Sequence, residues 1–150
     1  MKAVIQRVTH AEVAVDGQTV GSCEQGFLVL LGVAVGDTEA DAELLARKIV
    51  NLRIFQDEAG KMNRSIKDID GEMLVISQFT LMANCRHGNR PDFMESAKPD
   101  LAIPLYEYFK TCVSQEIRQV ECGVFGADMK VSLLNDGPVT IVLDTNMLKK

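Results

Sequence analysis

The segment SLLNDGPVTIVLD, residues Ser132–Asp144, consists of two strand-like halves on either side of a proline. Both SLL and VTIVLD are apolar, and the second is rich in β-branched residues, which is typical of β-strands. Asn135, Asp136 and Gly137 between the two halves favour a turn. Pro138 removes a backbone donor where the second strand begins, and sheets accept proline mainly at edges, strand starts or bulges. The segment therefore predicts a β-rich fold with an unusual backbone feature at this proline.

Residue chemistry alone leaves two conformations open for the Gly-Pro peptide bond. A trans proline would have to lie at a sheet edge, although the flanking segments are apolar enough to be buried. A cis bond would interrupt the ladder, turn the chain and hold two carbonyl oxygens in a fixed orientation. Folded proteins adopt cis at only about 5–6% of X-Pro bonds. The base rate favours trans, whereas the apolar flanks favour cis.

Strand patterns recur along the rest of the chain. An Asp16-Gly17 hairpin signal follows the alternating N-terminal residues, and GFLVLLGVAVG reads as a strand that is buried on both faces. A further strand is expected from Glu72 to about Phe79. The other expected strands are KAVIQRV, AEVAVDGQTVGSC with its turn at Asp16-Gly17, LRIF, RQVECGVF, DMKVSLLN and VTIVLD.

Two helices are expected. Helical spacing of apolar residues predicts the first from about Glu39 to Asn51, with Thr38 and Asp41 as a capping box at its start. The second is DLAIPLYEYFKTCVSQE, with Pro104 expected in or near the first turn, where the missing N–H costs nothing. Its expected apolar stripe is Leu105, Tyr108, Phe109, Cys112 and Val113, and the tail TNMLKK is expected to be frayed. These elements predict one α+β domain over residues 1–150, with a mostly antiparallel sheet and two main helices.

Composition narrows the function classes. The chain has 150 residues, of which 47% are apolar and 25% charged, as in globular proteins. No apolar run is long enough to span a membrane, and the N-terminal residues lack the apolar core of a signal peptide, so we expect a cytoplasmic protein. The net charge of −5 argues against a protein that coats nucleic acid. Four scattered cysteines and two histidines form no zinc spacing, so we expect free thiols and neither metal nor cofactor.

Known nucleophile templates fit poorly. The chain has no GxSxG motif. Cys85 and His87 are two residues apart and leave a cysteine hydrolase open, although the surrounding CRHGNRP reads as a flexible basic loop. In ISQFTLMA, polar residues surround Phe79 at the end of an apolar strand and precede that loop, which favours a binding site there. The alternative is a polar strand face that simply meets water.

These segments also resemble a known family. SQFTLMA, followed some tens of residues later by NDGPVT, is similar to the signature pair of the D-aminoacyl-tRNA deacylases, also called D-tyrosyl-tRNA(Tyr) deacylases. IQRV, FLVLLGV, NLRIFQDEAGKMN, RHGNRPDF and GVFGADMKVSLLNDGPVT match the family pattern in order, so the resemblance covers nearly the whole chain. The chain departs from the more usual residues of the family at Met82, Cys85 and Asp92. These departures affect the expected details of one loop and not the resemblance itself.

The resemblance implies a barrel-like sheet and a homodimer with an active site at each interface. In the family, a cis Gly-Pro peptide reaches from one subunit into the pocket of the other, which makes Gly137 and Pro138 the selectivity element here. Arg7 matches an arginine that supports this loop. The residues implied to line the receiving pocket are Ser77, Gln78, Phe79 and Thr80, with Met129 near the bound 3′-terminal nucleotide.

The implied reaction is hydrolysis of the ester that joins a D-amino acid to tRNA. We expect the N–H groups of Phe79 and Thr80 to stabilise the oxyanion. The Thr80 hydroxyl has no evident base and would be a weak nucleophile. The resemblance implies that the 2′-hydroxyl of the RNA assists the reaction, which fits this lack of a base. Rigid carbonyls that hold the amino group would exclude an L side chain by collision but would not exclude glycine, including glycine mischarged on tRNA(Ala).

Two further expectations remain. Lys61, Arg86 and Arg90 are candidates for contacts with tRNA phosphates, because an enzyme that needs only the 3′ end requires few cations. A non-enzymatic nucleic-acid-binding module is the alternative function.

Overall fold

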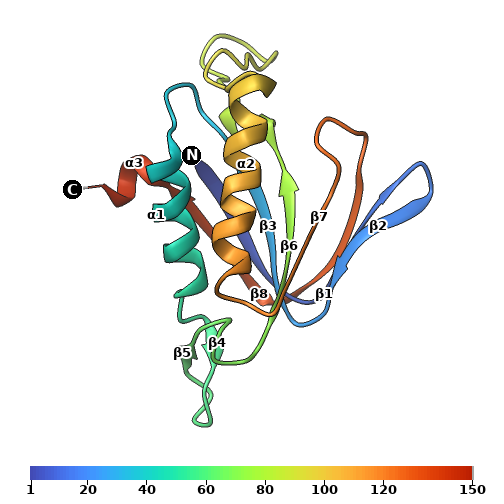
Figure 1. The fold of residues 1–150 in the computed structure, drawn as a ribbon, viewed down its shortest axis with the longest axis vertical. Helices are drawn as coiled ribbons and strands as arrows, with labels where there is room; N and C mark the ends of the chain where they lie inside the picture. The colour runs from blue at the N-terminus through green and yellow to red at the C-terminus, as the bar shows by residue number, and fades with distance from the viewer. Residues whose placement is uncertain (150) are drawn as a thin grey trace.

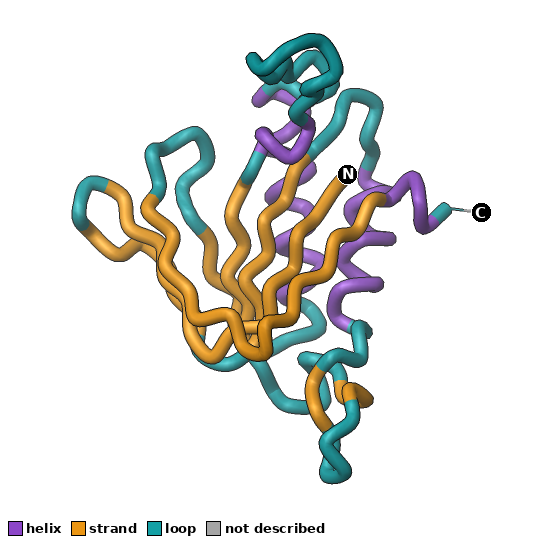
Figure 2. The backbone as a smooth tube through the Cα atoms, turned by 180° about the vertical axis from the view of Figure 1, so that it is seen from behind, coloured by secondary structure: helices purple, strands orange, loops and turns teal. Residues whose placement is uncertain are grey.

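A long, bent first strand organises the sheet. In the computed structural model, which describes residues 1–149, the first half of β1 (Lys2–Val15) pairs antiparallel with β3 (Gly26–Gly32) and its second half with β2 (Gln18–Cys23). The last strand, β8 (Lys130–Asp144), pairs antiparallel with β1 along both halves. The sheet curls strongly as a result (Figures 1 and 2).

The curled sheet is nearly closed where β2 approaches β7 (Gln119–Cys122). The backbone N–H of Ser22 donates to the Glu121 carboxylate at 2.9 Å. A Cβ at Gly21 would lie 2.6 Å from the Cys122 carbonyl oxygen, so only glycine permits this approach. The fold class predicted from the sequence, a single α+β domain with a barrel-like sheet, is confirmed.

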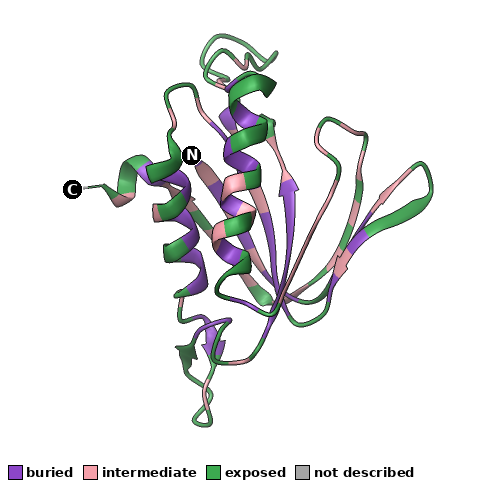
Figure 3. Cartoon of the chain, viewed as in Figure 1, coloured by how far each residue is buried: buried purple, intermediate pink, exposed green. Residues whose placement is uncertain are grey.

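Two strand pairs are parallel, which makes the sheet mixed. β6 (Glu72–Ser77) runs parallel to β3, and β7 runs parallel to β6. Parallel neighbours need long crossover connections. The connections here contain α1 (Glu39–Val50) and α2 (Pro99–Ser114), which lie side by side on one face of the sheet with their buried sides toward it (Figures 1 and 3).

The helix predictions are partly confirmed. Thr38 and Asp41 form the expected capping box of α1. In α2, Pro99 occupies the first turn and Pro104 lies farther inside the helix, so its predicted place was wrong. The buried residues of α2 are Ala102, Leu105, Tyr106, Phe109 and Val113, whereas Tyr108 and Cys112 are only half-buried, between α2 and α1.

Several boundaries also differ from the prediction. β6 ends at Ser77, which is the last residue of β6 that pairs with β3. The chain then forms a 3-10 turn, η1 (Phe79–Met82). The tail is not frayed up to residue 149: it forms α3 (Thr145–Leu148), and the Met1 amino group donates to the buried Thr145 hydroxyl at 2.9 Å. LRIF gives only β4 (Phe55–Gln56), which forms a small hairpin with β5 (Met62–Arg64).

Two strands were predicted around the Gly-Pro, but the structure has one, β8, with a bulge. Gln6 of β1 pairs with Thr140 and Val8 pairs with Asn135, so Asp136–Val139 face Arg7 alone. The extra residues leave the ladder and project from it, which accommodates a proline without a donor. The Gly137–Pro138 peptide bond is cis. No helix within residues 1–149 combines the length and apolar character needed to cross a membrane.

Candidate active site

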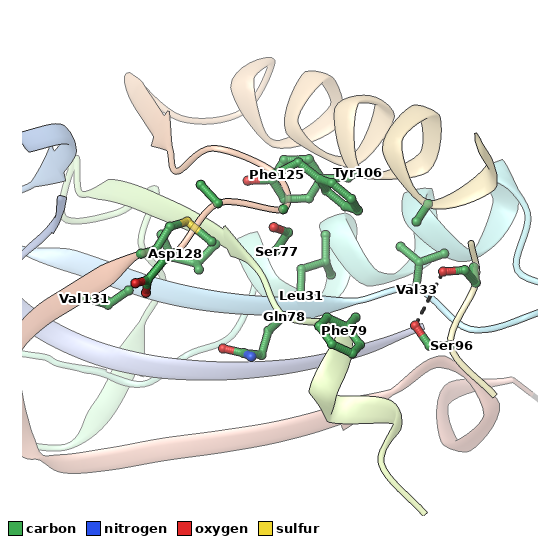
Figure 4. Close-up of a pocket in the computed structure, with 16 residues that line it drawn as sticks. Leu31, Val33, Ser77, Gln78, Phe79, Ser96, Tyr106, Phe125, Asp128 and Val131 are labelled. Atoms are coloured by element: carbon green, nitrogen blue, oxygen red, sulfur yellow. Dashed lines mark hydrogen bonds between the residues drawn. The ribbon is translucent and has the colours of Figure 1, made fainter. Parts of the chain in front are cut away.

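A cavity of about 260 Å³ lies where β6 ends, between the sheet, α2 and the segment 123–129 that follows β7 (Figure 4). Its walls are largely apolar, and the polar side chains among them include Ser77, Gln78 and Asp128. The other residues that line it are Leu31, Val33, Ile76, Phe79, Ser96, Ala97, Ala102, Tyr106, Phe125, Gly126, Ala127, Met129 and Val131. Such a cavity suits a ligand with one apolar part and a few polar groups.

The end of β6 places the predicted pocket residues at the cavity. The Gln78 N–H donates to the Leu31 carbonyl at 2.8 Å, which continues the β3–β6 pairing by one residue. In η1 the Leu81 N–H bonds to the Gln78 carbonyl at 3.2 Å, so the N–H groups of Phe79 and Thr80 precede the first such bond of the turn. Ser77, Gln78 and Phe79 line the cavity, whereas Thr80 lies just outside it.

The Thr80 hydroxyl has a local partner. The Gln78 amide donates to it at 2.5 Å, and both side chains reach solvent. No general base contacts this hydroxyl among the hydrogen bonds of residues 1–149. The geometry therefore favours a supporting role for Thr80 over a nucleophilic one.

Tyr106 is a cavity residue that the sequence analysis missed. Its buried hydroxyl donates to the Val75 carbonyl at 2.9 Å, and the same carbonyl accepts from the Gly123 N–H at 3.2 Å. Its ring packs against that of Phe125, with centroids 6.1 Å apart (Figure 4). Burial raises the pKa of the Tyr106 phenol well above its usual range, so it remains a donor. The stripe Ala102, Leu105, Tyr106, Phe109, with helical spacing, could have indicated it.

We expect Tyr106→Phe to lower the free energy of unfolding by about 1 kcal/mol, because the Val75 carbonyl loses one of two buried donors. Tyr108, two residues along α2, is half-buried, and its hydroxyl bonds to the exposed carboxylate of Glu43 on α1. Tyr108→Phe is therefore the matched control, with an almost unchanged free energy. Urea denaturation of both variants checks this, and equal losses would contradict the assigned role.

The Gly-Pro bulge lies elsewhere and is held by Arg7. This arginine is 6% exposed, and its Nε donates to the Asp136 carbonyl at 3.0 Å while its Nη1 donates to the Ile54 carbonyl at 2.6 Å. The Asp136 carboxylate lies 3.6 Å from the Nε atom. Asn135 accepts from the Val139 N–H at 2.8 Å and closes the other side of the bulge. The bulge is thus fixed from both ends.

The strand register separates the bulge from the cavity. Arg7 pairs with Phe27 on β3, which pairs with Met73 on β6, whereas Ser77 lies four residues farther along β6. Four strand residues span about 13 Å. The bulge is also on β8, and β1 and β3 lie between β8 and β6. Gly137 and Arg7 line a different groove, next to Phe55 and Asp57.

The three predicted phosphate-binding cations do not form one cluster. Arg86 and Arg90 lie in the loop that follows η1, and Lys61 lies in the β4–β5 hairpin; Figures 1 and 2 show these two segments at opposite ends of the molecule. All three side chains are exposed. Only the two arginines are on the cavity's side of the molecule.

Metal-binding and cysteine chemistry have little support in the part of the chain that the structure describes. Residues 1–149 contain no cluster of three or more His, Cys, Asp or Glu side chains suited to a metal. Burial raises the pKa of the Cys23 thiol to about 12, which makes it inert at neutral pH. Cys85 is exposed in the loop after η1 and is absent from the cavity wall.

A family model described as D-Tyr-tRNA(Tyr) deacylase matches residues 4–144. The chain belongs to this family. A D-aminoacyl-tRNA deacylase from Geotalea uraniireducens is 60% identical over 145 residues, which cover 97% of this chain and 94% of the relative. One from Thermus aquaticus is 56% identical over 146 residues, covering 97% and 96%. The predicted family is confirmed, and so is the predicted enzyme class, a hydrolase of the aminoacyl-tRNA ester bond.

Solved structures agree with the deacylase fold. A structure titled "c-Myc DNA Unwinding Element Binding Protein" is 43% identical, with a TM-score of 0.91, covering 96% of this chain and 98% of its own. A probable eukaryotic D-amino acid tRNA deacylase has a TM-score of 0.80 at 15% identity, covering 95% and 97%, and shows the fold alone.

Proposed function

We propose that this deacylase family member hydrolyses the ester of D-aminoacyl-tRNA to a free D-amino acid and tRNA and rejects L-aminoacyl-tRNA. One observation carries the proposal: a member of this family has both a cavity with apolar and polar groups at Ser77–Phe79 and a bulge at Gly137 that Arg7 supports. The cavity is suited to the terminal aminoacyl-nucleoside, and the bulge to reading the handedness of the amino acid.

A second copy of the chain supplies the bulge to the cavity in this proposal. Within one chain the bulge on β8 and the cavity at the end of β6 lie three strands apart and at different positions along the strands. One ligand is therefore not expected to contact both parts of the same chain. A homodimer in which Gly137 and Pro138 of one protomer reach Ser77 and Phe79 of its partner brings them together.

The chemistry needs little side-chain machinery. An aminoacyl ester is already activated, and attack by water places negative charge on the carbonyl oxygen. The Phe79 and Thr80 N–H groups at the start of η1 stabilise that charge, as in an oxyanion hole. The terminal 2′-hydroxyl of the RNA assists the attack, because no general base accompanies Thr80 in the described contacts.

Chirality is read by exclusion. Backbone carbonyls of the Gly-Pro segment hold the substrate's amino group, which fixes the orientation of its α-carbon. A D side chain then points to solvent, whereas an L side chain collides with backbone. Selection of this kind exceeds the discrimination that an apolar pocket gives, which is about 1–3 kcal/mol per methylene. Glycine has no side chain to exclude, so glycyl-tRNA, including glycine on tRNA(Ala), is also a substrate.

Deacylation of matched D-, L- and glycyl-tRNA tests the function, each with and without the terminal 2′-hydroxyl. We expect turnover of the D- and glycyl-tRNA, no turnover of the L-tRNA, and a large loss of rate for the 2′-deoxy forms. Equal rates for D- and L-tRNA would refute the selectivity.

A non-enzymatic nucleic-acid-binding module is the second candidate, because the neighbour at 43% identity is titled as a DNA-element-binding protein. A binder would protect D- and L-aminoacyl-tRNA equally and would show no turnover at substoichiometric protein. The same deacylation assay therefore separates the two functions.

Cys85→Ala distinguishes the proposed mechanism from a cysteine hydrolase. Cys85 is exposed and outside the cavity, so we expect kcat/KM for D-aminoacyl-tRNA to change less than twofold, whereas loss of a nucleophile costs several orders of magnitude. Steady-state deacylation of the purified variant is the measurement, and complete loss of activity would restore the cysteine mechanism.

A further inference from the structure

The loop between η1 and α2 is anchored at both ends. Asn84 and Asp92 exchange two backbone hydrogen bonds, of 2.9 and 3.0 Å. Farther along, the Ala97 N–H bonds to the Val33 carbonyl at 3.0 Å, and the Val35 N–H bonds to the Glu95 carbonyl at 2.9 Å. The backbone of Phe93 and Met94, between these two anchors, is therefore held at both ends.

Phe93 extends the apolar surface of the cavity outward. The Phe93 ring meets the Phe79 ring edge to face, with centroids 5.0 Å apart. Phe79 is 55% exposed and Met94 is 84% exposed, which is high for such large apolar side chains. Phe79 also lines the cavity, so Phe79 and Phe93 form one continuous apolar surface, which we name the aromatic strip. Figure 4 shows Phe79 at the edge of the site.

The same loop carries cations. Arg86 and Arg90 are exposed between the Asn84 and Asp92 anchors, and the Arg86 N–H bonds to the Asn84 side chain at 3.0 Å. Aromatic rings beside guanidinium groups are the combination that holds unpaired nucleic acid: the rings stack on bases and the cations contact phosphates. Unpaired RNA bases are recognised in this way, because they are free to stack.

We propose that the aromatic strip binds the unpaired nucleotides that precede the terminal nucleoside of the substrate RNA, with a base stacked on Phe93 and phosphates near Arg86 and Arg90. The proposal rests on the proposed deacylase function, which places the terminal nucleoside in the cavity. Because Phe79 belongs to both the cavity wall and the strip, an RNA strand that leaves the cavity past Phe79 meets Phe93 next. A second copy of this chain is the alternative occupant.

Two substrates of different length test the proposal. D-aminoacyl-adenosine reaches only the cavity, whereas a D-aminoacyl-CCA trinucleotide also reaches the aromatic strip. For Phe93→Leu, which keeps apolar volume against Phe79 but removes the ring, we expect the ratio of kcat/KM for the trinucleotide to that for the nucleoside to fall about tenfold. Phe93→Tyr keeps the ring and should retain the ratio of the unsubstituted protein.

The outcomes are distinguishable. An unchanged ratio in Phe93→Leu overturns the aromatic strip as a binding site. If the unsubstituted protein does not hydrolyse full-length D-aminoacyl-tRNA, the proposed function fails, and the aromatic strip fails with it as a site for that substrate. A variant that slows both substrates equally and lowers the molar mass in light scattering shows that the strip is a subunit contact, which also overturns the proposal.

The arginines have a separate readout. For Arg86→Gln and Arg90→Gln, the slope of log kcat/KM for the trinucleotide against log salt concentration should become shallower by about 0.7 for each lost phosphate contact. The slope for D-aminoacyl-adenosine should not change. Lys48→Gln, at an exposed position on α1, is the charge-matched control. Equal slopes in all three variants would remove the arginines from the proposed site.

Discussion

Gly137→Ala should lower kcat/KM for D-aminoacyl-tRNA on the order of 100-fold, because a displaced reading element costs about that much in rate. Gly137 has φ +133°, where residues with a Cβ are strained. An added Cβ would lie 2.9 Å from the Val139 Cγ2 atom and 3.0 Å from the Arg7 Nη2 atom. The bulge must therefore move, and its carbonyls move with it. Single-turnover deacylation of D- and L-aminoacyl-tRNA measures both rate and selectivity.

Gly17→Ala is the matched control for this substitution. Gly17 also has positive φ, at +77°, but an added Cβ there would have no neighbour within 4 Å. It lies in the turn between β1 and β2, away from both the cavity and the bulge. We expect it to lower the melting temperature modestly and to leave deacylation unchanged. If the two variants lost stability equally and neither lost activity, Gly137 would have no special role.

Arg7→Lys should lower kcat/KM by about tenfold to 100-fold and destabilise the fold by about 2 kcal/mol. The guanidinium donates one hydrogen bond to the Asp136 carbonyl from Nε and another to the Ile54 carbonyl from Nη1. A lysine retains the charge but offers a single ammonium in place of this fork. One buried carbonyl then loses its donor, and the bulge loses its support. Chemical denaturation and deacylation kinetics measure the two effects.

Arg53→Lys is the corresponding control. Arg53 also uses two nitrogens, to the backbone and side chain of Asn63, but these contacts are exposed. We expect little change in either stability or activity. An Arg7→Lys variant that behaved like Arg53→Lys would show that charge alone holds the bulge.

Much of the fold is predictable from sequence because local patterns and tertiary packing agree. The Thr38–Asp41 capping box begins a helix as predicted. The apolar run that starts at Gly26 forms the buried strand β3, although the strand ends at Gly32 and not at Gly36. The order and direction of strand pairing were harder to predict from the sequence. β3 and β6 pair in parallel because a helix connects them, and no pattern within either strand distinguishes parallel from antiparallel pairing.

The predicted site was incomplete for a related reason. Ser77, Gln78, Phe79 and Met129 do meet at one cavity. Residue chemistry indicated the segment that contains the first three, whereas Met129 and the roles of all four came from the family resemblance. Tyr106 was missed because the neighbouring tyrosine was assigned to the buried stripe, and two tyrosines two residues apart look alike in sequence. The distance between Lys61 and the two arginines was not predictable, since it depends on how the β4–β5 hairpin projects.

Because the Gly137 bulge and the Ser77 cavity occupy distant parts of one sheet, the proposed catalyst exists only as a pair of chains and must obey mass action. Its specific activity would decline on dilution below the dissociation constant of the pair. Mixing a chain damaged only at the bulge with one damaged only at the cavity would regenerate one intact composite site per hybrid. Two inactive preparations would thereby complement each other.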